Sequence, residues 1–142
     1  MSVLKGPLSA YREVSVRTAS QGKLIVMLYD EAIKQTEIAI KLLEEKSKKL
    51  DVVHNALIRA QDVITELMAG LDFDRGGEMA RNLLSLYLFF NEKLREANLK
   101  KSVEILLPVR DFLSDLRSAW AQIAKVRSED AGTGSVGVNI AG

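Results

Sequence analysis

Residues 76–99 read GGEMARNLLSLYLFFNEKLREANL and predict a helix with more apolar surface than one packing face uses. At the helical step of about 100° per residue, five apolar side chains share one face: Leu83, Leu86, Tyr87, Phe90 and Leu94. Leu84 and Leu88 form a second stripe, one turn apart, and Phe89 points in a third direction. The first stripe suits the core of a small bundle. The second predicts contact with another helix, from this chain or from a partner.

Three further segments show the three- and four-residue spacing of amphipathic helices. The first starts near Ser20 and runs to residue 45, the second spans residues 51–69, and the last spans residues 102–127. Pro108 lies inside the last segment, so either that helix kinks or a short turn over residues 102–106 precedes it. Four helices with short connections predict an all-α fold, an antiparallel four-helix bundle. Within it, Leu83, Tyr87, Phe90 and Leu94 are predicted core residues.

Both ends of the chain differ in composition from these segments. Residues 1–19 contain a Gly6-Pro7 turn signal and apolar side chains too sparse for a helix core, which predicts an N-terminal arm lying across the bundle. Residues 128–142 are rich in glycine and serine, which predicts a flexible C-terminal tail. The bundle itself is predicted to occupy residues 20–127.

Composition excludes several classes of protein. The chain has 142 residues, enough for one domain with its own core, and no cysteine, so thiol and disulfide chemistry are excluded. Its 20 basic and 19 acidic residues are mixed along the chain, without the basic stripe of a nucleic-acid binder. No apolar run reaches the roughly 18 residues of a membrane span, and the start lacks a signal sequence. We expect a soluble, cytoplasmic protein.

Residues with catalytic or metal-binding potential are sparse. His54 is the only histidine, preceded three residues earlier by Asp51, so a di-iron bundle with two Glu-x-x-His pairs is excluded. The run from Asp72 to Gly76 begins like a calcium loop, but Leu83 stands where such a loop needs glutamate. We therefore expect these acids and glycines to turn the chain between helices. The sequence predicts no catalytic residue, no metal site and no cofactor.

What remains is surplus apolar surface on the first and third predicted helices. Large apolar patches on a soluble protein usually mark partner sites. The alternative is that both helices are central and are covered by their neighbours and the arm.

Four blocks of sequence carry a family resemblance through their order and spacing. They are Tyr11 with Val16-x-Thr18-Ala19-Ser20 and Met27-Leu28-Tyr29-Asp30; Ala60 to Leu67 with Leu71-Asp72; Gly76-Gly77-Glu78-Met79-Ala80-x-Asn82-Leu83 with Leu86-Tyr87; and Leu113-x-x-Leu116-Arg117-x-Ala119-Trp120. Over roughly residues 11–124 the chain resembles the flagellin-binding export chaperones, the FliS family. It departs from the family's usual residues at Gln21, Glu31 and Leu88.

This resemblance implies a helical chaperone that holds the C-terminal segment of flagellin, keeps it from polymerising, and delivers it to the flagellar type III export apparatus. An amphipathic segment in a groove is recognised through spaced apolar anchors, which agrees with the surplus stripes. The predicted partner-binding residues are Ile25, Tyr29, Ile40, Leu84 and Leu88, with Leu8 and Tyr11 as a movable cap. The alternative function is a structural homo-oligomeric bundle without a flagellin client, and a homodimer stays open.

Overall fold

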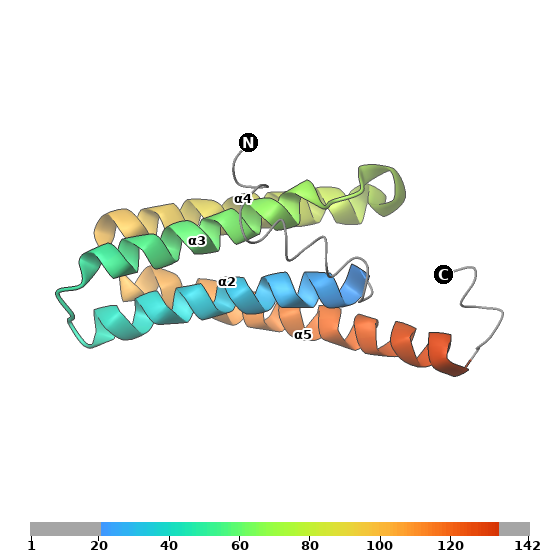
Figure 1. The fold of residues 1–142 in the computed structure, drawn as a ribbon. Coiled ribbons are helices and arrows are strands. Elements are labelled where there is room, and N and C mark those ends of the chain that lie inside the picture. Colours follow the sequence, from blue (N-terminus) through green and yellow to red (C-terminus); the bar gives the residue numbers. More distant parts are fainter. Residues whose placement is uncertain (1–20, 134–142) are drawn as a thin grey trace.

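The computed structural model describes residues 21–133, with side chains through residue 126. This part of the chain forms four helices: α2 (Gln21–Glu44), α3 (Leu50–Ala69), α4 (Phe73–Lys100) and α5 (Val103–Thr133). Each helix runs back along its predecessor, which makes an elongated antiparallel bundle (Figure 1). The predicted all-α four-helix bundle is confirmed. The predicted arm lies outside the described residues.

The helices pack as a ring of four neighbours. Helix α2 packs against α3 and α5, and α4 packs against the same two helices, so α2 and α4 lie diagonally across the bundle (Figure 1). The contact between α4 and α5 is the least extensive of the four. One side of the ring is therefore less tightly closed than the others.

The core follows the predicted apolar spacing. Tyr87, Phe90 and Leu94 of α4 are buried as predicted, whereas Leu83, one turn before them, is only half-buried. Small side chains allow the backbones to approach, since Ala32, Ala39, Ala56, Ala60 and Ala97 are all in the core. On α5, Phe112 and Ile123 share a helix face with the buried Val109 and Leu113, yet they remain 43% and 42% exposed. The core therefore covers less of α4 and α5 than the periodicity predicted.

Local signals set the helix ends. Gly70 directly follows the last residue of α3. The side chain of Asp72 accepts hydrogen bonds from the backbone N–H groups of Asp74 and Arg75, each at 3.1 Å, and so caps α4. Because of this cap, α4 begins at Phe73, before the predicted start at Gly76, and the segment expected to turn the chain forms the first turn of the helix. The Ser102 hydroxyl accepts from the Ile105 N–H at 3.4 Å and precedes the first residue of α5.

Two predictions about the last helix are wrong. The alternative with a turn over residues 102–106 fails because α5 begins at Val103 and includes Pro108. Pro108 is the sixth residue of α5, so it removes one internal hydrogen bond, the one to the carbonyl of Glu104, and its ring lies on the exposed side of the helix. The helix also continues past residue 127 to Thr133. No helix in the described part is both long and apolar enough to cross a membrane.

Candidate functional site

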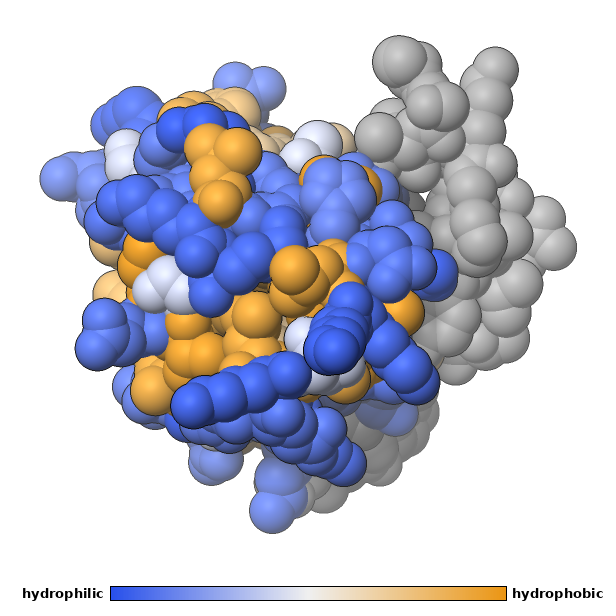
Figure 2. Space-filling view, turned by 90° about the vertical axis from the view of Figure 1, so that its left-hand side faces the viewer, coloured by the Kyte–Doolittle hydropathy of each residue, from blue (hydrophilic) through white to orange (hydrophobic). Residues whose placement is uncertain are grey.

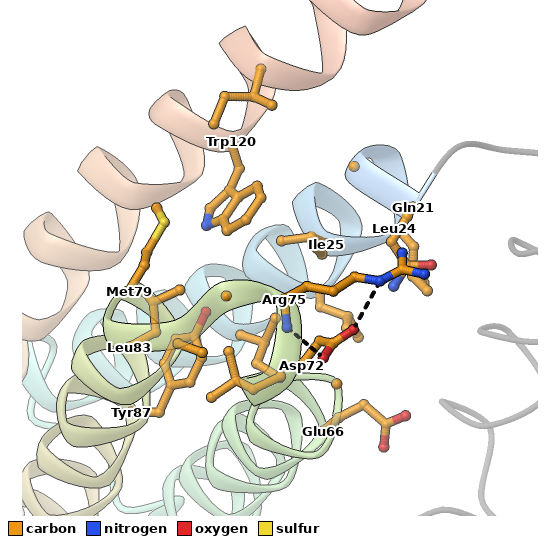
Figure 3. Close-up of a pocket in the computed structure, with 18 residues that line it drawn as sticks. Gln21, Leu24, Ile25, Glu66, Asp72, Arg75, Met79, Leu83, Tyr87 and Trp120 are labelled. Atoms are coloured by element: carbon orange, nitrogen blue, oxygen red, sulfur yellow. Dashed lines mark hydrogen bonds and ion pairs between the residues drawn. The ribbon is translucent and has the colours of Figure 1, made fainter. Parts of the chain in front are cut away.

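A cavity of about 470 Å³ opens at the end of the bundle where α2 begins, α3 ends and α4 begins (Figure 3). This volume lies within the range of about 300–1,000 Å³ that is typical of ligand pockets. Helix α5 closes one side through Trp120 and Ile123. Apolar side chains dominate the wall: Leu24, Ile25, Leu28, Leu67, Leu71, Met79, Leu83, Tyr87, Trp120 and Ile123. We call this cavity the apolar pocket.

Gly77 shapes the pocket by dividing α4. Its backbone has φ 52° and ψ −126°, a conformation that only glycine adopts without strain, so the first turn is set off from the rest of the helix. Gly76, beside it, lines the pocket, and a Cβ there would lie 2.9 Å from the Cβ of Ala80. The two glycines therefore bring the start of α4 across the end of the bundle.

Three ring side chains connect the pocket to the core. Trp120 points from α5 into the space between Met79 of α4 and Ile25 of α2 (Figure 3). The Tyr29 and Tyr87 hydroxyl oxygens lie 2.6 Å apart, and both side chains are buried. Burial raises the pKa of Tyr29 above its ordinary 10.0, and Tyr87 raises it further, while a hydrogen bond with Trp120 opposes the rise. Burial also raises the pKa of Tyr87.

Charged and polar groups lie at the margin of the pocket. Arg75 and Asp72 approach to 3.7 Å, and both side chains are largely exposed. An exposed pair of this kind contributes little stability, so Arg75 is available to a ligand at small cost. Glu66 of α3 brings a buried carboxyl group to the wall. This arrangement suits an apolar ligand with polar groups at its ends.

An exposed apolar strip continues from the pocket along α4 and α5. Its members are Met79 (60% exposed) and Phe89 (48%) on α4 and Phe112 and Ile123 on α5. The rings of Phe90 and Phe112 meet edge to face with centroids 5.4 Å apart, which fixes α5 against α4 at the end of the strip that is farther from the pocket. The strip follows the least extensive helix contact, so it offers a partner an elongated apolar surface.

The seven predicted partner-binding residues have different positions. Ile25 is half-buried and lines the pocket, as a partner-binding residue should. Tyr29 and Ile40 are instead buried in the core, because α2 has a neighbouring helix on two sides, and they present no surface to a partner in this structure. Leu8 and Tyr11 lie outside the described residues.

Leu84 and Leu88 lie apart from the pocket. Leu88 is 53% exposed and Leu84 is half-buried. They share a face of α4 with Asn91, whose side chain donates to the Thr65 hydroxyl of α3 at 3.2 Å. Their stripe therefore lies on the α3 side of α4. Partner binding by any of the seven residues stays a prediction.

Apart from Ile25, helical periodicity missed the residues that build the pocket. Leu83 and Trp120 share helix faces with buried residues, so their spacing assigns them to the core. Met79 and Ile123 were not among the predicted partner-binding residues. The Gly76-Gly77 pair was the one available signal, since two glycines before a helix permit a kink.

The rest of the described structure offers little for catalysis. His54 is exposed, and its Nδ1 accepts a hydrogen bond from the Asn98 amide at 2.9 Å. No group of three or more potential ligands among the described residues is placed to hold a metal ion. A helical bundle with an open apolar pocket and an adjoining exposed strip is typical of a protein that binds another polypeptide.

Comparison with known proteins identifies the family of this chain. The family described as flagellar protein FliS matches residues 4–127. The flagellar secretion chaperone FliS of Bacillus subtilis is 30% identical over 134 residues, covering 94% of this chain and 98% of the relative. Those of Salmonella typhimurium and Vibrio cholerae are 38% and 32% identical over 124 residues, covering 82% and 84% of this chain and 89% and 90% of the relatives. The chain belongs to the FliS family of flagellar secretion chaperones, which are not enzymes.

Proposed function

We propose that this chaperone binds the C-terminal segment of flagellin in the apolar pocket and along the exposed strip. A client helix would place apolar side chains against Ile25, Met79 and Ile123 at its successive turns. Binding there would hide the segment from other flagellin molecules, prevent premature polymerisation in the cytoplasm, and keep the client ready for delivery to the flagellar export apparatus. The observation that carries the proposal is the open pocket of about 470 Å³ in a family of secretion chaperones.

The shape of the site supports a long client. The pocket and the strip together extend along α4 and α5 from Met79 to Phe112. A segment that orders on binding must offset the entropy of ordering, so a distributed apolar surface suits it better than one deep cavity. The stripe of Leu84 and Leu88 stays proposed as a second contact for a client that reaches around α4.

We further propose that Leu8 and Tyr11 form a movable cap over the pocket when no client is bound. An apolar pocket left open in the free chaperone would favour aggregation. A cap on the same chain would shield it and would have to be displaced by the client.

Calorimetric titration with a peptide of the flagellin C-terminal segment tests the function directly. Saturable binding by the folded full chain, weakened by a glutamate at a pocket position, supports it. Absence of binding by a chain with full helical circular dichroism contradicts it. Leu88→Glu reports on the second stripe, because it leaves the pocket intact. A tight dimer in sedimentation that is indifferent to the peptide would favour the homo-oligomeric alternative.

A further inference from the structure

The two connections at the end of the bundle opposite the apolar pocket carry an excess of positive charge. Two connections lie there, residues 45–49 between α2 and α3 and residues 101–102 between α4 and α5 (Figure 1). They hold one carboxylate, Glu45, and four lysines: Lys46, Lys48, Lys49 and Lys101. The connection at the pocket end, residues 70–72, has no lysine. The connections at the two ends of the bundle therefore differ in charge.

Two exposed leucines accompany these lysines. Leu50 begins α3 directly after Lys48 and Lys49, and Leu99 is followed directly by Lys100 and Lys101. Leu99 is 73% exposed and Leu50 is 46% exposed. Figure 2 shows this end of the molecule, where apolar side chains gather between hydrophilic ones. We call the Lys48–Leu50 and Leu99–Lys101 segments together the lysine tip.

Hydrogen bonds hold the tip in shape. The Lys101 amine donates to the backbone carbonyl of Asn98 at 2.5 Å and to its side-chain oxygen at 2.7 Å. The Asn98 amide in turn donates to His54 near the start of α3, at 2.9 Å. These contacts tie the end of α4 to α3, so both leucines are presented by one rigid end of the bundle.

We propose that the lysine tip docks the protein on the surface of an anionic lipid bilayer. Lysines beside exposed apolar side chains are the pattern by which soluble domains bind such surfaces, with the amines at the phosphates and the leucines among the headgroups. Glu44 and Glu45 oppose this attraction, and Glu96 opposes it through its ion pair with the Lys100 amine at 3.0 Å. Asp51 and Glu104 oppose it less, because each lies in a first turn where the positive helix end offsets its charge.

The docking surface is separate from the apolar pocket. The pocket lies where α2 begins and α3 ends, and the lysine tip lies where α2 ends and α3 begins. A client in the pocket would therefore leave the tip free to meet the membrane. The inference does not rest on the identity of the client, because the empty chaperone carries the same tip.

Vesicle flotation with the full chain tests the proposal. At low salt we expect binding to vesicles of phosphatidylglycerol mixed with phosphatidylcholine and none to phosphatidylcholine alone, with loss of binding as salt screens the charges. The double variant Lys48→Gln/Lys49→Gln should bind roughly thirtyfold more weakly, about fivefold for each lysine. Leu99→Ser should also weaken binding, because it removes the most exposed apolar side chain of the tip.

Matched variants test whether vesicle binding depends on the lysines of the tip or on surface lysines in general. Lys34→Gln/Lys125→Gln removes two exposed lysines from the sides of α2 and α5 and should leave vesicle binding unchanged. The proposal is overturned by equal loss in this control, by equal binding to neutral vesicles, or by absence of binding at low salt. It is also overturned if immobilised polyglutamate captures the chain while anionic vesicles do not, since the tip would then recognise an acidic polypeptide. Circular dichroism of each variant confirms that the helices remain folded.

Discussion

The phenolic oxygens of Tyr29 and Tyr87 lie 2.6 Å apart inside the bundle and share a hydrogen bond. Tyr29 belongs to α2 and Tyr87 to α4, the diagonal helices, and their rings are tilted with centroids 6.3 Å apart. A buried hydroxyl without a partner is costly, so this bond specifies which turn of α2 meets which turn of α4. Tyr87 also lines the apolar pocket, so the same bond holds part of the pocket wall in place.

Tyr87→Phe is expected to lower the free energy of unfolding by about 1–3 kcal/mol, because it leaves the buried Tyr29 hydroxyl without this partner. Tyr29→Phe should have a similar effect. The double variant should cost less than the sum of the two, since it removes both hydroxyls together. Urea unfolding of the three variants measures the coupling. Strict additivity would show that the bond contributes no stability of its own.

The same pair predicts a loss of stability in alkali. The folded-state pKa of both tyrosines is raised above the ordinary 10.0, so the unfolded state releases its phenolic protons first. The contribution of the two tyrosines to the free energy of unfolding is therefore complete below pH 10 and falls as the pH rises above 10. Unfolding free energy measured across this range should fall more steeply for the natural chain than for Tyr29→Phe/Tyr87→Phe. Because both chains share the same lysines, parallel curves would contradict the prediction.

Gly77→Ala is expected to destabilise the protein by about 1–3 kcal/mol, because φ 52° with ψ −126° strains any residue with a Cβ. The comparison is Gly70→Ala, where φ is −88° and a new Cβ would meet its nearest atom at an ordinary 3.7 Å. That substitution should change stability little or raise it slightly. Thermal unfolding of the two variants distinguishes conformational strain at Gly77 from a general effect of glycine replacement.

Ile123→Glu is expected to weaken binding of the flagellin peptide at least tenfold, because it places a charge in the apolar pocket. Ile58→Glu is its matched control, since Ile58 of α3 is 40% exposed against 42% for Ile123 and lies outside the pocket. Calorimetry measures both affinities, and the fluorescence of Trp120, the chain's single tryptophan, reports pocket occupancy. An equal loss of peptide affinity in the two variants would show that the client does not bind in the pocket.

Deleting residues 1–15 is expected to raise the affinity for the flagellin peptide and the binding of an apolar dye, because the deletion removes the proposed cap containing Leu8 and Tyr11. Titration of the shortened and full chains under identical conditions provides the measurement. The point variant Tyr11→Ser should shift both quantities in the same direction by a smaller amount. If affinity and dye binding stay the same in the deletion, the segment does not cover the pocket.

Local chemistry made much of the fold predictable from the sequence. Apolar side chains at three- and four-residue spacing define α3 and most of α4, and Gly70 and Asp72 mark the boundary between them. These signals act through neighbouring residues, so they do not depend on the rest of the bundle. The motif blocks around Gly76-Gly77 and Ala119-Trp120 likewise led to the family, because order and spacing are properties of the chain itself.

Only the tertiary structure decided which apolar faces are covered. Tyr29 and Ile40 looked available to a partner, yet they are buried because α2 is enclosed by α3 and α5. Trp120 and Leu83 looked like core residues, yet they line an open pocket because α4 bends at Gly77 and meets α5 over a short contact. The sequence thus determined the four helices and the family, whereas α4 begins earlier and α5 ends later than their apolar spacing predicted. Burial depends on how closely helices that are distant in the sequence approach one another. The spacing of apolar residues along one helix does not determine that distance.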